Sequence, residues 1–402
     1  MKAYLELLRV PGVGRIIAAQ LTARFPGGML SLAFLLHVEQ QSGSYGAAGL
    51  VLAATSVGQA VAGPLTSRWM GAWGMRPVIA LTLSVCTVAI LTMAFAPLTV
   101  PTYALVGLIA GLSTPPIQPA VRTIYPKLVT SKQLTPLFSL DASAQEIIWV
   151  VGPVIATFVA TQISTSLAIA VAGGFLVLGG LWFVSSPELG RVRIPRSKRR
   201  FGRVLLRPTV ALATATGFLL IGATAAIEAS VVAVFGHGGP EAGIVLAVWA
   251  IGSLAGGLGF GHVPIGPWAL ARRVALVFVG MALASLWLDF WWLTAALLIA
   301  GIGMAPALAA LFAIVSSSVK FSDTAEAYGW TGTGQLIGAA LGSAIAGLLI
   351  DEHGPVGGFW AGIAFAALGA LVPAIFHRSL PDLRGRDASP IPDTEPVPTQ
   401  PS

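Results

Sequence analysis

The chain has 402 residues, of which 55% are hydrophobic and only 10% are charged, and its formal net charge is +7. Soluble domains contain about 25% charged residues, so this composition excludes an ordinary soluble protein and favours one that buries its apolar surface in lipid. A single cysteine, Cys86, excludes disulfides within the chain and any Cys-based metal site. The start of the chain has no typical cleavage pattern, and we expect no removed signal peptide.

Apolar segments of membrane-spanning length recur along the whole chain. A spanning helix needs about 20 mostly apolar residues. Charges and Gly-Pro turns divide the chain into segments that predict an all-α membrane protein with twelve transmembrane helices, at residues 16–37, 47–67, 77–97, 101–122, 137–161, 165–185, 208–233, 241–261, 271–289, 292–317, 326–350 and 356–377. The prolines inside 101–122 and 292–317 fit this prediction because neighbouring groups can satisfy the freed carbonyls.

Positive charges lie on one side of the predicted helices. With twelve spans, 22 of the 23 Lys and Arg, all except Arg24, fall on one side: before the first span, after the last, or in alternate connections and at the span ends beside them. The positive-inside rule then places both termini in the cytoplasm. The excess of Arg over Lys agrees with a high-GC bacterial source, so we expect a multi-pass protein of a bacterial inner (cell) membrane. The opposite connections carry only acids among their charged residues, namely Glu39, Glu241, Asp289, Asp351 and Glu352.

The distribution of charge and proline also predicts the domain boundaries. We expect a cytoplasmic N-terminus (1–15), an N-terminal six-helix bundle (16–185), a basic cytoplasmic linker (186–207), a C-terminal six-helix bundle (208–377) and a disordered cytoplasmic tail (378–402). Nucleic acid is an alternative partner for the linker, but positive-inside charge needs no such partner, and we expect anionic lipid headgroups there. The tail is Pro-rich, polar and aperiodic, which is typical of disorder.

Two segments in corresponding helices repeat each other. Residues 48–63 read AGLVLAATSVGQAVAG, and residues 242–257 read AGIVLAVWAIGSLAGG. The shared spacing predicts two pseudo-symmetric bundles with a substrate site at their interface. Chance similarity of helices rich in small residues is the alternative, because such residues let any helix pair pack closely.

Two short motifs add a family resemblance. The segment GPLTSRWMGAWGMRP (63–77) resembles the loop motif between the second and third helices of the major facilitator superfamily, with Ser67 in place of the usual Asp. The pair Gly152-Pro153 resembles the element that marks the antiporters of that superfamily. The resemblance covers about residues 10–380 and implies a monomeric transporter that works by alternating access. The gating residues it implies, together with the repeat counterpart of the first, are Gly63, Arg68, Gly74, Arg76, Gly152, Pro153 and Gly257.

Four ionisable residues stand out away from the ends of predicted spans or late in them, where they are costly and usually functional. Arg24 and Glu146 are expected at similar depth, and we predict that they form an ion pair. Either Glu146 or Asp141 could then bind and release a proton, although a purely structural ion pair is the alternative. Glu228 lies late in its span, either as a further proton-coupling residue or close to the outer water.

Uncharged polar residues and the absence of enzyme motifs narrow the range of possible functions. Gln20, Gln118 and Gln335 are candidates for the substrate cavity, with a hydrogen bond to a neighbouring helix as the alternative for each. The histidines lack metal-ligand spacing, and no nucleotide-binding loop, dinucleotide fingerprint or nucleophile elbow is present, so we expect no enzyme, metal or cofactor. The sequence predicts a secondary transporter that exports a small organic compound, such as a drug or metabolite, in exchange for protons. The alternatives are an importer or symporter of the same fold and a non-transporting membrane sensor or scaffold.

Overall fold

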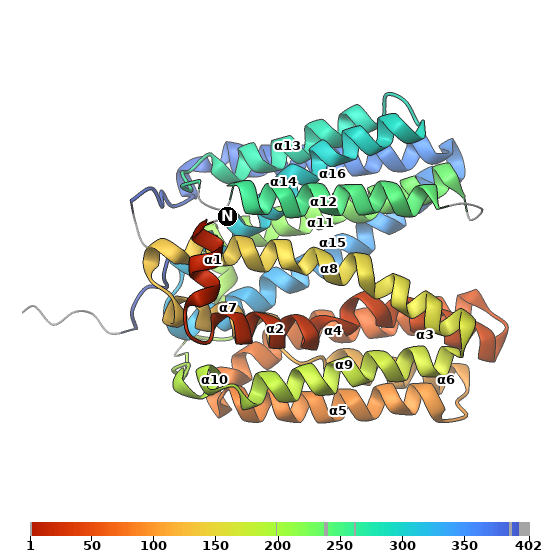
Figure 1. Cartoon of the computed structure of the whole chain (residues 1–402), viewed down its shortest axis with the longest axis horizontal. Helices are drawn as coiled ribbons and strands as arrows, with labels where there is room; N and C mark the ends of the chain where they lie inside the picture. Colours follow the sequence, from red (N-terminus) through yellow and green to blue (C-terminus); the bar gives the residue numbers. More distant parts are fainter. Residues whose placement is uncertain (1, 198, 237–239, 261–262, 386–387, 394–402) are drawn as a thin grey trace, which may run out of the picture.

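The structure is a computed structural model that describes residues 2–197, 199–236, 240–260, 263–385 and 388–393. The described residues form long, roughly parallel helices and the turns between them (Figure 1). The chain passes repeatedly from one end of the molecule to the other, as expected for a chain of apolar helices of bilayer length.

The helices fall into two groups that follow each other in the chain. The N-terminal half contains α2 (Val13–Arg24), α3 (Pro26–Ser42), α4 (Tyr45–Trp73), α5 (Met75–Phe95), α6 (Val100–Leu112), α7 (Ile117–Leu128), α8 (Ser131–Gln162) and α9 (Thr165–Ser185). The C-terminal half contains α11 (Pro208–Phe235), α12 (Glu241–Phe260), α13 (Ala269–Ala284), α14 (Phe290–Ser318), α15 (Phe321–His353) and α16 (Pro355–Ile375). Four short elements are α1 (Lys2–Arg9), α10 (Pro187–Arg191), η1 (Arg203–Leu206) and η2 (His377–Ser379).

The predicted fold class is confirmed. Among the described residues, 11 helical segments are long and apolar enough to cross a membrane. Helix α13, with 16 residues, completes the twelve. Two of the spans are broken by proline, which lacks the amide hydrogen that continues a helix. Pro26 separates α2 from α3, and Pro115 with Pro116 separates α6 from α7.

Small residues bring the helices of each half into close contact. A Cβ added to Gly338 on α15 would lie 2.1 Å from the carbonyl oxygen of Phe218 on α11, so a larger residue cannot replace this glycine without moving the two helices apart. Apolar side chains such as Val88, Leu178 and Leu348 are more than half exposed. Such a surface is suited to lipid rather than to water.

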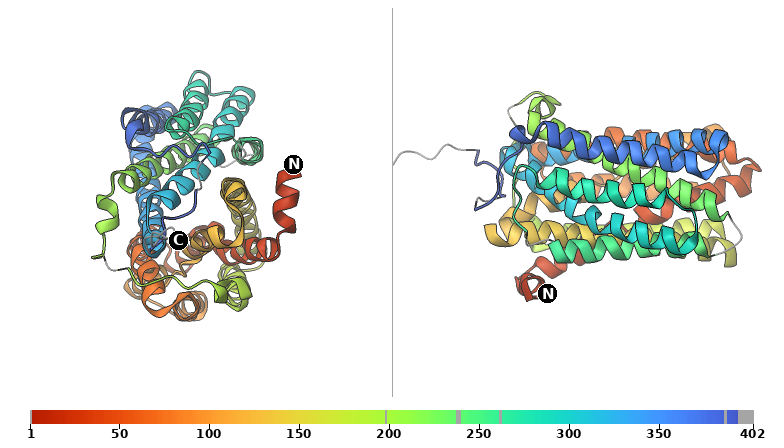
Figure 2. Two further views of the ribbon diagram at one scale, coloured as in Figure 1. Left: turned by 90° about the vertical axis from the view of Figure 1, so that its left-hand side faces the viewer. Right: turned by 90° about the horizontal axis from the view of Figure 1, so that it is seen from above.

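One end of the bundle gathers the N-terminal helix α1, the linker residues 186–207 and the segment that follows α16. We call it the basic end; it lies on the left of Figure 1 and faces the viewer in the left panel of Figure 2. In that panel the red-to-yellow-green helices of the N-terminal half lie below the green-to-blue helices of the C-terminal half.

The expected disorder of residues 378–402 is wrong for the part of this tail that the structure describes. Leu380, Leu383 and Ala388 are buried at the basic end. The Ile391 amide donates to the Val319 carbonyl at 2.9 Å, and Asp393 accepts a 2.6 Å hydrogen bond from the Ser322 hydroxyl. Scattered apolar residues of this segment, and one acid that contacts the start of α15, hold it in place, although its proline content suggests disorder. Residues 394–402 lie outside the described part.

Candidate functional site

The two halves meet along two helix pairs that the sequence repeat relates to each other. Helix α4 packs against α15, and α8 packs against α12. In the first pair, a Cβ added to Gly63 would lie 3.2 Å from the carbonyl oxygen of Gly329. In the second, a Cβ added to Gly257 would lie 1.8 Å from the Ser143 hydroxyl. Both repeat-related glycines therefore occupy close approaches between the halves.

Hydrogen bonds reinforce both contacts. The Gly257 carbonyl accepts from the Ser139 hydroxyl at 2.5 Å and from the Tyr4 hydroxyl at 3.0 Å. The Thr333 hydroxyl donates to the Ala60 carbonyl at 2.7 Å, one turn from Gly63. These bonds satisfy backbone carbonyls in an apolar interior, where an unpaired group is costly.

Ion pairs join the halves closer to the basic end. The Arg68 guanidinium lies 2.6 Å from the carboxylate of Glu326 on α15. The other Glu326 oxygen accepts from the Gly202 amide of the linker at 2.8 Å. One turn earlier on α15, Asp323 accepts from the Ser197 hydroxyl at 2.6 Å and pairs with Arg199 at 3.4 Å. We call these contacts of Ser197, Arg199 and Gly202 with α15 the linker latch.

The linker latch and the two glycine contacts close the basic end between the halves. Asp323 and Glu326 are buried there, and sequence reasoning missed both. The available signal was their charge: these two acids stand three residues apart at the start of a span, on the side of the protein where Lys and Arg otherwise collect.

A buried polar cluster lies within the N-terminal half, centred on Asp141. One oxygen of this carboxylate accepts from Gln20 Nε2 at 3.0 Å and from Arg24 Nη1 at 3.3 Å. The other oxygen accepts from Arg122 Nε at 3.0 Å. Asp141 and Gln20 are fully buried, and Arg122 is 3% exposed. Two guanidinium groups therefore share one carboxylate in the interior.

Glutamine side chains complete the cluster and leave its charge unbalanced. Arg24 donates to Gln20 Oε1 at 2.7 Å and to Gln145 Oε1. With its amide oxygen turned toward the guanidinium groups, Gln118 accepts from Arg122 at 2.7 Å. Amide oxygens satisfy hydrogen-bond donors but carry no charge. The two arginines and one aspartate therefore keep an excess of one positive charge.

The cluster also reaches the other half, because the Arg122 guanidinium lies 3.3 Å from the centre of the Phe312 ring on α14. Sequence reasoning placed Arg122 at the cytoplasmic end of the predicted span 101–122 and so missed it. Helix α7 continues to Leu128 and carries Arg122 inside the bundle. A stacked cation–π contact at this point couples the charged cluster to the most buried helix of the C-terminal half.

The predicted ion pair between Arg24 and Glu146 is wrong. Arg24 pairs with Asp141, whereas Glu146 accepts a 2.9 Å hydrogen bond from the Ser253 hydroxyl on α12. Asp141 and Gln145 are one turn apart on α8 and so face α2 together. Glu146 is one residue further, which rotates it by about 100° toward the C-terminal half.

Glu146 and Glu228 come from different halves. Their carboxylates lie close enough to interact electrostatically. The Glu228 side chain is exposed on α11, and Glu146 is partly exposed. In the described part of the chain neither acid forms a salt bridge with Lys, Arg or His. The acids inside the bundle therefore have two kinds of surroundings. Asp141 pairs with two arginines, whereas Glu146 and Glu228 pair with no cation among the described residues.

The remaining predicted residues lie within single halves. Gln335 packs against Gly217 of α11, and its amide nitrogen is buried with no hydrogen-bond partner among the described residues. Gly74 adopts a φ of 94° between α4 and α5, and Arg76 donates to the Ser186 carbonyl at 3.1 Å. Gly152, followed by Pro153, packs against α3, where an added Cβ would lie 2.8 Å from the Gly28 backbone.

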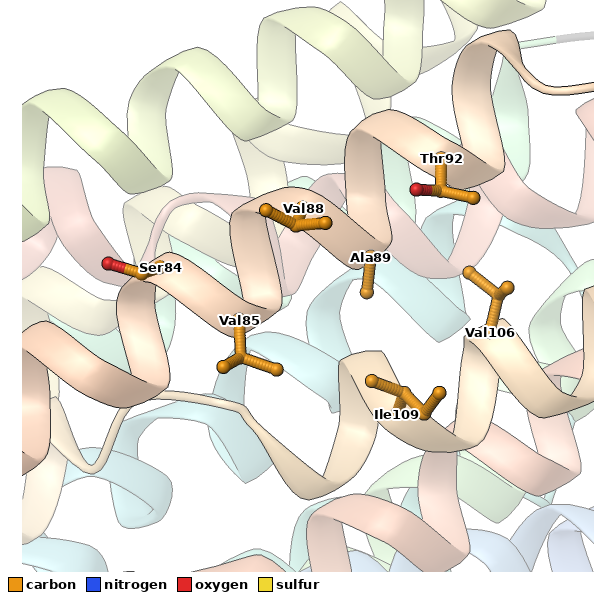
Figure 3. Close-up of a pocket in the computed structure, with 7 residues that line it drawn as sticks. All are labelled: Ser84, Val85, Val88, Ala89, Thr92, Val106 and Ile109. Carbon is orange, nitrogen blue, oxygen red and sulfur yellow. The ribbon is translucent and has the colours of Figure 1, made fainter.

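A groove on the outside of the N-terminal half is distinct from this interface. It has a volume of about 450 Å³, runs between α5 and α6, and is lined by Ser84, Val85, Val88, Ala89, Thr92, Val106 and Ile109 (Figure 3). Both helices belong to the same half, and the lining valines Val85 and Val88 are exposed on its surface. Its apolar lining and position suit lipid chains. The described residues contain no group of three or more potential metal ligands.

Comparison with known proteins identifies the fold and the family. The family model described as Major Facilitator Superfamily matches residues 16–288 and 235–399. The human organic anion transporter MFSD10 (TETRAN) is 16% identical, with a TM-score of 0.69, covering 90% of this chain and 100% of that one. A bacterial homologue of the iron transporter ferroportin in an outward-facing state is 14% identical, with a TM-score of 0.72, covering 91% and 99%. No curated protein matches the sequence.

The structural neighbours share the fold at low identity, and the family model covers nearly all of the chain. An interface between two six-helix halves is the place where transporters of this architecture hold their substrates. The chain belongs to the major facilitator superfamily and is a membrane transporter.

Proposed function

We propose that this protein is a secondary active transporter that exports a small organic compound in exchange for protons by alternating access. The observation that supports proton exchange most directly is the placement of Glu146 and Glu228. These acids come from opposite halves, interact with each other, and have no cationic partner among the described residues. Two such carboxylates that repel each other favour shared proton binding over double ionisation.

Asp141 is a poorer proton carrier in this proposal. Its carboxylate accepts from Arg24, Arg122 and Gln20, and protonation would break several charge-assisted hydrogen bonds. We therefore assign proton exchange to Glu146 and Glu228 and a positioning role to Asp141.

The excess positive charge around Arg24 and Arg122 supports a substrate that carries a negative group. A buried charge without full compensation gains most from a ligand of opposite sign. The human structural neighbour is an organic anion transporter, which agrees with this proposal. Gln118 would add neutral hydrogen bonds beside these arginines, whereas Gln20 is fully buried and orients Arg24 and Asp141, and Gln335 stays a candidate within the C-terminal half.

We further propose that the basic end faces the cytoplasm of a bacterium and that the structure represents the state open to the outside. The Lys and Arg distribution supports this orientation. The linker latch closes the basic end, and one structural neighbour is described as outward-facing. The protein is proposed to act as a monomer.

The decisive experiment uses proteoliposomes with an imposed pH gradient, fluorescein as an anionic probe and ethidium as a cationic one. Gradient-driven transport of fluorescein should fail in Glu146→Gln and Glu228→Gln, while exchange without a gradient persists because it needs no proton release. Glu352→Gln, at an exposed position, is the matched control.

The direction of coupling separates export from symport. If the probe accumulates in the compartment of lower pH, it moves opposite to the protons, which supports exchange. If it accumulates in the compartment of higher pH, it moves with the protons, which supports an importer or symporter. Full gradient-driven transport by both glutamine variants would reject proton coupling through these acids.

A further inference from the structure

Three arginines surround one cavity at the basic end. The cavity has a volume of about 430 Å³ and is lined by Arg199, Arg203, Leu206 and Arg207. The backbone explains this gathering. Gly202 adopts a φ of 78°, which reverses the chain, and the single turn of η1 then brings Arg203 and Arg207 to the same side. Guanidinium groups bind phosphate oxygens through paired hydrogen bonds, so this arrangement has the chemistry of a phosphate receptor.

The cavity carries more positive charge than the nearby acidic side chains neutralise. Arg207 donates to the Ser318 carbonyl, which is neutral. Burial and the neighbouring Arg199 cation both lower the pKa of Arg207, and Asp323 acts in the opposite direction. Asp323 pairs with Arg199 at 3.4 Å and is thereby engaged already in the linker latch. A bound dianion would relieve the crowding of like charges.

The position of the cavity fits a phosphate at a membrane surface. Arg207 immediately precedes α11, so its guanidinium lies where a spanning helix leaves the hydrocarbon layer. Leu206, which also lines the cavity, is 77% exposed, and Phe201 nearby is 47% exposed. The exposed Leu206 side chain beside three cations suits a phospholipid headgroup with its chains alongside.

We propose that this cavity binds a phosphate group, from a phospholipid headgroup or a free phosphate ester, and that the bound phosphate competes with Asp323 for Arg199. The competition follows from the geometry, because one guanidinium serves both the cavity and the linker latch. Occupancy thereby loosens Ser197, Arg199 and Gly202 from α15 and favours opening of the basic end. Linkage requires the reciprocal effect: a state with an open basic end binds phosphate more tightly.

Binding is tested on the full-length protein in detergent by native mass spectrometry. The probes are dioleoyl phosphatidic acid, dioleoyl phosphatidylglycerol, dioleoyl phosphatidylcholine and inorganic phosphate. Arg203→Gln removes one lining cation without touching the linker latch, and we expect about a tenfold loss of phosphatidic acid affinity, as for one charge-assisted contact. Arg193→Gln removes the same charge from an exposed linker position outside the cavity and should change affinity less than twofold.

The arms of this experiment separate the two sources of phosphate. Displacement of phosphatidic acid by millimolar inorganic phosphate identifies a site for the free group, and resistance to displacement identifies a lipid headgroup site. Either result supports the proposal. Equal binding by Arg203→Gln and the unmodified protein, or an equal loss in Arg193→Gln, overturns it. Melting temperatures of all variants confirm that they are folded.

Coupling to the linker latch needs a second measurement. Spin labels at R200C and K320C report the distance between the linker and the start of α15. The one native cysteine, Cys86, is buried, so we expect it not to take up the label. Phosphatidic acid should broaden and lengthen this distance in the unmodified protein and leave it unchanged in Arg203→Gln. Lipid binding with an unchanged distance in the unmodified protein would overturn the competition for Arg199.

Discussion

Gly63 on α4 and Gly329 on α15 face each other across the interface between the halves, and a Cβ added to Gly329 would lie 2.6 Å from the Gly63 carbonyl oxygen. Real Cβ atoms do not approach a carbonyl this closely, so only glycine permits the observed helix spacing. We predict that Gly329→Ala forces α4 and α15 apart, weakens closure of the basic end and slows transport at least severalfold. Gly63→Leu should do the same more strongly, because its side chain is larger.

Helix α15 supplies the control for this prediction. Gly332 is three residues from Gly329 and has no neighbouring atom within 4 Å of an added Cβ, so Gly332→Ala should transport normally. Distances between spin labels on α4 and α15 report the spacing directly. Normal transport and an unchanged distance in a well-expressed Gly63→Leu variant would contradict the assignment of this contact to gating.

The second prediction concerns Asp141, which neutralises part of the charge on Arg24 and Arg122. Asp141→Asn leaves two buried guanidinium groups without any carboxylate, and removal of one partner from a buried pair costs about 3–5 kcal/mol. We expect a large fall in melting temperature in detergent. Arg24→Gln should cost less, because Arg122 and Asp141 remain paired at 3.0 Å.

The matched control is Asp351→Asn, since Asp351 is exposed at the end of α15. Its melting temperature should equal that of the unmodified protein. An Asp141→Asn variant as stable as the Asp351→Asn variant would show that the cluster does not depend on this carboxylate.

The helices could be predicted from the sequence because lipid imposes one simple requirement on each of them. A run of apolar residues of bilayer length has few alternatives to a spanning helix, and charge at the ends fixes the count. The predicted segment 165–185 coincides with α9, whereas the tail after α16 was expected to be disordered because a few apolar anchors do not form a periodic pattern.

The partners of the buried charged side chains could not be predicted from the sequence in the same way. Arg24 was assigned to Glu146 by depth alone, and depth does not distinguish Asp141 from Glu146 when the rotation of α8 is unknown. Arg122 is expected at the cytoplasmic end of the span 101–122, because the end of a helix cannot be located to one turn from hydropathy. Partner choice in the interior depends on rotations and shifts of a few ångströms that only the packed structure supplies.

The third prediction tests the orientation. A reporter active only outside the cytoplasm should be active when fused after Gln41 and after Gly354, which end the spans containing α3 and α15. The same reporter should be silent after Arg199, in the basic linker. Activity after Arg199 would reverse the proposed orientation, and silence at the other two positions would contradict the order of the spans.

The last prediction concerns Glu188, whose side chain is 4% exposed and accepts a hydrogen bond from Arg15. Burial alone would raise the pKa of Glu188, but the hydrogen bond and the positive charge of Arg15 outweigh it, and the pKa lies below its usual value of 4.5. A carboxylate with a lowered folded-state pKa stabilises the protein at neutral pH, and this contribution is lost as the pH falls through that pKa. Since Arg15 is 45% exposed, we expect Glu188→Gln to cost only about 1 kcal/mol at pH 7. The difference in melting temperature between the two proteins should shrink to zero as the pH is lowered from 5 to below the Glu188 pKa. A difference that stays constant over this range would assign the cost to packing around Gly12, which the Glu188 side chain also contacts, rather than to the charge.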